Sequence, residues 1–354
     1  MVKVSNGKAT WEGKVIALTK QRCSLVDRQG RLVHLPVGSL KTFEKTAVAF
    51  RSHPITTFRQ ELRKEFPNYE VAGSMRYLVV GPPRIARKYA KLFDSVYRDV
   101  EKFFRVRGFK VKTPDVPLVA VVFSTPQEFY AYCRRDDVPP SNTLRGYYSL
   151  VSNRVALYDP DRASVKNSIK ATEDFGPHFS SSTATAFVGI SQDTADTIIH
   201  ETTHQVGYNI GVHSRMGGTP IWVIEGLATA LEPDAMRRTQ GSRGSASRIN
   251  AERSEWFASE HRPGRQAGNL ARLVASDKHF NSDILNSYSE AWAFTYFLLE
   301  NSVRCKQFVN YLHTVENRDV TKAYTARQRL DDFEAAFGDL SRVELDFLRA
   351  MDRM

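Results

Sequence analysis

The run His200-Glu201-Thr202-Thr203-His204 decides how the rest of the chain is interpreted. Two histidines four residues apart on a helix point from the same face, so both imidazoles can reach one zinc ion at about 2.0–2.1 Å. Glu201 lies between them, where a carboxylate can take a proton from water beside the metal without being a ligand. The residue types therefore suit a zinc site with its own base.

The surrounding sequence predicts a helix, which gives this spacing its meaning. Asp193 or Thr194 can cap its start, and Gly211 suits its end. The run matches the HExxH pattern of zinc hydrolases. The longer form with a third histidine is excluded, because Ile210 occupies that position. The apolar positions of the expected helix are Ile198, Ile199 and Val206.

A catalytic zinc usually has three protein ligands and one position left for water. Glu225 is the predicted third ligand, because it is a carboxylate inside the apolar segment 220–228, where Pro220 suits a first helical turn. A carboxylate among apolar neighbours is costly unless it is paired or binds a metal. His213 and Glu232 are alternative ligands, and Glu232, on the same helix face as Glu225, can instead support a ligand by hydrogen bonding.

These segments resemble the gluzincin branch of zinc metallopeptidases, and more narrowly a bacterial family of uncharacterised gluzincin-like (peptidase-MA-like) domains. The similarity runs from about Tyr69 to the C-terminus. It implies zinc (Zn²⁺) ligands His200, His204 and Glu225, the general base Glu201 and a thermolysin-like core, but no known substrate. The residues that carry it are His200-Glu201-x-x-His204-Gln205, Asn209, Gly211, Pro220-x-Trp222-x-x-Glu225-Gly226-Leu227-Ala228, and the segments 146–148, 153–158 and 288–294.

Residues 286–300 predict a helix with one buried side and Tyr288 near its start. Gluzincins commonly use a Tyr or His donor to hold the oxyanion that forms when water attacks the scissile carbonyl. Tyr288 is the predicted donor, with His213 and Tyr208 as weaker alternatives. An interfacial tyrosine whose hydroxyl is satisfied elsewhere is the competing interpretation.

The N-terminal residues predict short strands at 11–18, 22–26 and 31–35, with turn signals between them. They weakly resemble a small SH3-like barrel of the Sla-type homology domains, which would be a binding module or a spacer. Residues 51–70 are polar and are interrupted by Pro54 and Pro67. We therefore expect a barrel over 1–50, a linker over 51–70 and a gluzincin-like domain over 71–354.

From residue 75 the pattern alternates between strand and helix, which predicts an α+β fold. The expected fold is a zincin-like catalytic domain, with a small mixed sheet, an active-site helix and a helical C-terminal subdomain, preceded by the barrel. In zincins an edge strand pairs with extended substrate, and either strand of the expected hairpin is a candidate for this role. The expected elements are strands 77–80 and 118–123, helices around 89–103 and 126–134, a hairpin of 145–149 and 154–158, loops at 160–192 and 237–248, and two or three amphipathic helices within 305–354.

The chain has 354 residues and a net charge of +11, and the excess charge is concentrated near its start. Through Glu70 there are 13 Lys and Arg against 6 Asp and Glu, which leaves 37 against 33 for the remainder. Such a face suits an acidic partner, although a solvated surface is the commoner explanation. No basic cluster alternates with aromatics as in nucleic-acid binding. Cys23, Cys133 and Cys305 are too scattered for a disulfide framework and predict buried free thiols.

No apolar run is long enough for a membrane span, and the first residues have no apolar segment typical of a secretory signal, which leaves the compartment open. The leading hypothesis is a zinc-dependent peptidase that acts on a peptide or protein. The alternative from another class is a protein with an inactive or minor zinc site, which binds an acidic partner through the basic barrel. Glu201 argues against it, because a structural zinc needs no base and normally takes four protein ligands. Hydrolysis of another kind of amide is a related enzymatic possibility.

Overall fold

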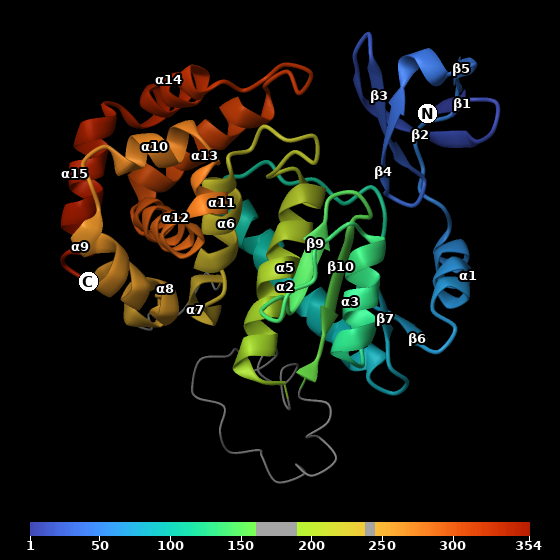
Figure 1. Ribbon diagram of the computed structural model, residues 1–354, viewed down its shortest axis with the longest axis horizontal. Helices are drawn as coiled ribbons and strands as arrows, with labels where there is room; N and C mark the ends of the chain where they lie inside the picture. The colour runs from blue at the N-terminus through green and yellow to red at the C-terminus, as the bar shows by residue number, and fades with distance from the viewer. Residues whose placement is uncertain (161–189, 238–244) are drawn as a thin grey trace. The chain divides into compact units, whose positions relative to one another are not determined.

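The computed structural model describes residues 1–160, 190–237 and 245–354. The described residues form two compact units, the first made of 1–98, 113–160 and 190–205, and the second of 99–112 and 206–354 without 238–244. The first unit contains two five-stranded sheets, and the second is helical (Figure 1). The α+β class predicted from the sequence is thus confirmed.

The N-terminal sheet is antiparallel, with the strand order β4-β3-β2-β1-β5. Alternation of apolar and polar residues buries one face around Val4, Cys23 and Leu25, each with 0% exposure. Within residues 1–50, all of which are described, β4 and β5 do not pair, so the expected closed barrel is wrong. The β4 edge instead bonds to the hairpin of the other sheet, through Leu32 N–H and Val151 O at 2.8 Å. The strands are β1 (Val2–Ser5), β2 (Thr10–Leu18), β3 (Arg22–Asp27), β4 (Leu32–Pro36) and β5 (Thr42–Lys45).

Residues 51–70, expected to be a linker, contain helix α1 (Ile55–Glu65). Phe58 and Leu62, one turn apart, are buried in the apolar cluster that covers one face of the second sheet. The helix ends on an ion pair, in which Arg154 Nη1 donates to both carboxylate oxygens of Glu65 at 2.8 and 3.0 Å. Burial would raise the pKa of Glu65, but Arg154 and Arg135 lower it below its usual value.

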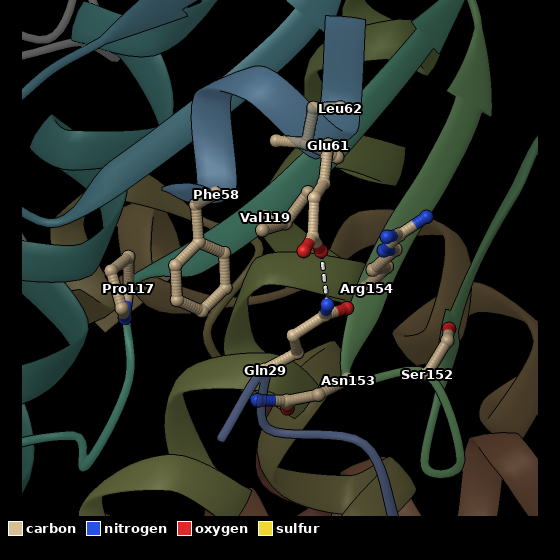
Figure 2. Close-up of a pocket in the computed structure, with 9 residues that line it drawn as sticks. All are labelled: Gln29, Phe58, Glu61, Leu62, Pro117, Val119, Ser152, Asn153 and Arg154. Atoms are coloured by element: carbon tan, nitrogen blue, oxygen red, sulfur yellow. Dashed lines mark hydrogen bonds between the residues drawn. The ribbon is translucent and has the colours of Figure 1, made fainter. Parts of the chain in front are cut away.

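A small polar cavity of about 10 Å³ lies between Gln29, helix α1 and residues of the second sheet, and it is large enough for about one water molecule. Figure 2 shows Gln29, from the turn between β3 and β4, pointing at Glu61 of α1 and hydrogen bonded to it. Arg154 and Asn153 line the same cavity. Polar contacts therefore hold the N-terminal sheet against α1 within the first unit.

The second sheet is mixed, in the order β6-β7-β8-β10-β9. Strands β7, β8 and β10 are parallel, and the two edge strands β6 and β9 are antiparallel to their neighbours. Every residue of β8 is buried, as its continuous apolar run predicts. The predicted strands and hairpin are confirmed. The elements are β6 (Glu70–Gly73), β7 (Tyr77–Gly81), α2 (Ala86–Val106), β8 (Leu118–Phe123), α3 (Pro126–Arg135), β9 (Gly146–Ser149) and β10 (Arg154–Tyr158).

Helix α12 (Ile284–Leu299) is the core of the helical unit, with all residues from 289 to 299 buried. Trp222 of α6 stacks on Phe308 and Tyr311, at ring-centroid distances of 5.9 and 6.0 Å. Three helices occupy the C-terminal region, as predicted. The helices of this unit include α6 (Ile221–Ala230), α7 (Asp234–Arg237), α8 (Ala251–Trp256), α9 (Arg262–Gly264), α10 (Asn269–Ala275), α11 (His279–Ser282), α13 (Ser302–Glu316), α14 (Ala326–Phe337) and α15 (Leu340–Met351).

Cys23, Cys133 and Cys305 are buried free thiols, as predicted, and burial raises the pKa of each, that of Cys133 to about 11. Among the described helices, none has the length and apolar character needed to cross a membrane. The loops expected at 160–192 and 237–248 fall largely on 161–189 and 238–244, outside the described residues.

Candidate metal centre

Helix α5 (Gln192–Ile210) carries both histidines of the 200–204 run. Its buried face includes Ile198, Ile199 and Val206, each with 0% exposure. The helix stops at Gly211, whose φ of 92° lies in the left-handed region that glycine adopts most easily. The predicted helix and its glycine end are confirmed.

The two imidazoles converge at one point on this helix. Nε2 of His204 lies 3.0 Å from Nε2 of His200, and the ring planes are at 86°. Two nitrogens bound tetrahedrally to one zinc at 2.0–2.1 Å would be about 3.3 Å apart. His204 is 8% exposed and His200 is partly buried, so the pair is near the surface yet shielded. The spacing of these nitrogens fits a shared cation.

Glu225 is brought to the same point by helix α6. One ligand atom from each of His200, His204 and Glu225 lies within 4.8 Å of the others. No other group of three or more His, Cys, Asp or Glu side chains with this proximity occurs in the described residues. Two imidazole nitrogens and one carboxylate oxygen are a donor set that zinc accepts, and they leave a fourth position open.

Close packing against α12 fixes the backbone of α6 next to Glu225. A Cβ added at Gly226 would lie 2.2 Å from Thr295 Oγ1 and 2.6 Å from the carbonyl oxygen of Ala291. Real Cβ atoms do not come this close to a backbone oxygen. Glycine at this position therefore lets the two helices approach, and the sequence alone did not reveal this role.

Replacing Gly226 with alanine is expected to lower the free energy of unfolding by about 1–3 kcal/mol, because the helices must separate to admit the methyl group. The displaced α6 should also weaken zinc binding through Glu225. Urea unfolding followed by circular dichroism measures the first effect, and zinc titration the second. Gly264→Ala is the control, because nothing lies within 4 Å of its added Cβ. Equal stability of the two variants would contradict the packing argument.

Glu201 follows His200 on α5 and is partly buried. It is not a member of the cluster of ligand atoms, and its role as the general base stays a prediction. The alternative ligands also lie outside that cluster: Asn250 donates to a carboxylate oxygen of Glu232, and the buried ring of His213 packs on Gly207. A Cβ at Gly207 would come within 2.7 Å of His213 Cδ2, which explains the glycine there.

Tyr288 lies in the first turns of α12 and is partly buried. Its ring meets Phe280 edge to face at 5.7 Å, and Arg253 Cζ lies 5.8 Å from its centroid. Tyr208, an alternative donor, packs against the ring of His213 at 5.2 Å. These contacts describe where the two rings lie. They do not assign either hydroxyl to the metal cluster, so the identity of the oxyanion donor stays a prediction.

Gln205 has a positioning role that the sequence did not reveal. Its side-chain amide nitrogen donates to the carbonyl oxygens of Val119 in β8 and Asn153 before β10, at 3.0 and 2.8 Å. Both bonds are buried and join α5 to the sheet one residue after His204. A glutamine on the inner face of a predicted helix was the available signal, because a buried amide needs partners.

The edge strand β9 lies beside the same helix. A Cβ at Gly146 would be 2.8 Å from Cγ2 of Thr197, one turn before the first histidine. Arg145 Nη2 also contacts Asp193 Oδ2 at 3.2 Å, across the start of α5. Glycine in β9 thus permits a close approach of strand and helix (Figure 1).

Comparison with known families gives a match over the helices of this centre. A family described as "Protein of unknown function (DUF1570)" matches residues 194–320, about a third of the chain. No curated protein matches the chain. The matched segment contains His200, Glu201, His204, Glu225 and Tyr288, so the chain is similar to this family over the whole candidate centre.

Proposed function

We propose that the protein is a zinc-dependent peptidase of the gluzincin type, with a zincin-like arrangement of sheet and active-site helix. The observation that carries this proposal is the convergence of His200, His204 and Glu225 within 4.8 Å. Three protein donors with a vacant fourth position are typical of a catalytic zinc, whereas a structural zinc takes four.

A bound zinc ion would supply Lewis-acid chemistry, polarising the scissile carbonyl and making a neighbouring water more acidic. Glu201 would accept the proton of the attacking water and pass it to the leaving nitrogen, so that the C–N bond breaks and an amine departs. A donor such as Tyr288 would hydrogen bond to the carbonyl oxygen as negative charge develops there.

Strand β9 is the proposed substrate-binding strand. Strand β10 is bonded on both sides, to β8 and β9, whereas β9 is bonded to β10 alone among the described strands. An extended peptide can therefore add to β9 but not to β10. The close approach of Gly146 to Thr197, where an added Cβ would not fit, supports this choice, because it sets β9 beside the helix that carries His200.

Zinc content and hydrolysis should be lost together on chelation. We expect one zinc per chain by elemental mass spectrometry, and cleavage of members of a quenched fluorescent peptide library. Treatment with 1,10-phenanthroline should abolish both, because His200, His204 and Glu225 alone cannot polarise a carbonyl as the cation does. Added zinc should restore both. Absence of metal after zinc reconstitution, or cleavage that survives complete metal removal, would refute the proposal.

A further inference from the structure

A groove of about 580 Å³ lies at the opposite edge of the second sheet from β9. All four residues of strand β6 line it, together with Arg59 and Arg63 of α1 and Arg87 of α2. Among the described strands β6 pairs only with β7, so no described strand bonds to its outer edge, which the groove borders. The proposed peptidase chemistry does not use this groove.

The hydrogen-bonding pattern of β6 shows which backbone groups face the open side. Ser74 N–H donates to Tyr77 O at 2.9 Å, so Ser74 and Tyr77 form a hydrogen-bonded pair. The pairs Gly73–Leu78 and Val71–Val80 lie one and three positions further along the same ladder. Bonded and non-bonded pairs alternate in an antiparallel ladder. Val71 and Gly73 therefore direct their N–H and C=O groups away from β7, toward the edge.

The groove has an excess of positive charge on the side of α1. Arg59 reaches over the strand, since a Cβ at Gly73 would lie 2.3 Å from Arg59 Nη2. Neither Arg59 nor Arg63 forms an ion pair within the described part of the chain, whereas Arg87 pairs with Glu70 at 3.4 Å. The lining of the groove thus contains three guanidinium groups and a single carboxylate, that of Glu70.

Arg59 and Arg63 are separated along α1 by nearly the same distance as alternate residues along a β-strand. They are four residues apart on α1, which is about 6.0 Å along the helix axis. Residues i and i+2 of an extended peptide are about 6.6 Å apart. Arg59 lies close to Gly73, the last residue of β6. Because only residues 66–69 join α1 to β6, we expect Arg63, one turn later on α1, to lie nearer Val71.

We propose that this groove binds an acidic segment of a partner protein in an extended conformation, which adds to the open edge of β6 as a further strand. The outward N–H and C=O groups of Val71 and Gly73 bond the backbone of the segment. Carboxylates at alternate positions of the segment pair with Arg59 and Arg63. The inference goes beyond the proposed hydrolysis and does not depend on a metal.

The test uses the full chain with Glu201→Gln, so that the probe stays intact, and a fluorescein-labelled Ser-Glu-Val-Glu-Val-Glu-Ser peptide. Saturable binding is expected by fluorescence anisotropy, and it should weaken with salt. Arg59→Ala and Arg63→Ala should each raise Kd by about fivefold, the effect of about 1 kcal/mol, and the double variant by about 20-fold or more. Lys64→Ala is the matched control, because it removes an exposed charge from the same helical turn outside the groove.

Two N-methylated peptides separate strand addition from attraction of charge alone. Methylation of the residues whose N–H groups face β6 should abolish binding, and methylation of the alternate residues should not. Equal binding of both peptides, no binding at all, or an equal loss in Lys64→Ala would overturn the proposal. Tighter, Arg63-dependent binding of a single-stranded oligonucleotide would also overturn it. If Arg59→Ala does not fold, the exposed Arg63 carries the test alone.

Discussion

Replacing Glu201 with glutamine is expected to reduce kcat for peptide hydrolysis by about 10²–10⁴-fold, the usual contribution of a general base. Glutamine has nearly the same shape as glutamate but cannot accept a proton at neutral pH. Zinc content should stay at the wild-type value, because Glu201 is not a member of the ligand cluster. The side chain is partly buried on α5. Because glutamine is uncharged and nearly the same size as glutamate, the substitution neither opens a cavity nor buries a new charge.

The measurement combines initial rates on the best library peptide with elemental analysis of the same samples. Glu252→Gln is the matched control, because it makes the same chemical change on an 80% exposed side chain of α8. The control should retain full activity. Wild-type kcat in the Glu201→Gln protein would remove this residue from the mechanism, even if zinc is bound.

The parts of the fold that the sequence predicted follow from local rules. Helix α5 combines a polar start, apolar residues on one face and a glycine in the left-handed region at its end, all within about 20 residues. The continuous apolar run of β8 and the turn at Asn153, whose φ is 59°, similarly fixed the hairpin and buried strand. Because the sequence predicted this helix, it also predicted that His200 and His204, four residues apart, lie on the same helix face.

The differences arise where distant segments meet. Three of the five N-terminal strands were predicted, at 11–18, 22–26 and 31–35, whereas β1 and β5 were not. The arrangement of the strands depends on which edges pair, and β4 meets the hairpin at Val151 instead of closing a barrel. Helix α1 was missed because only Phe58 and Leu62 within it are buried, and Phe66 just after it, in a segment between two prolines. Its stability comes from packing on the second sheet, which propensity does not show.

The same limit applies to the candidate site. The choice between the two hairpin strands required the parallel pairing of β10 with β8, which leaves β9 at the edge. The support that Gln205 gives to α5 and the tight packing of Gly226 on α12 involve residues more than 50 positions apart in the sequence. Residue types can suggest such roles, but only tertiary contacts assign them.

His204→Ala and Glu225→Ala are each expected to lower the affinity for zinc by more than about 100-fold, beyond the 10–100-fold typical of residues that only support a ligand. Each substitution removes one of three donors and leaves a site with two, which holds zinc weakly. Zinc per chain after dialysis against a weak chelator is the measurement. His313→Ala is the matched control, because this partly buried histidine of α13 lies outside the cluster and should leave zinc content unchanged.

The two variants test different parts of the site, because His204 lies on α5 and Glu225 on α6. Loss of zinc in both would mean that the two helices jointly form the centre, as the 4.8 Å cluster indicates. If only His204→Ala loses zinc, the third ligand is another side chain, with His213 and Glu232 as the first to substitute. If both variants keep wild-type zinc, the convergence of the three side chains has another cause, and the peptidase proposal fails with it.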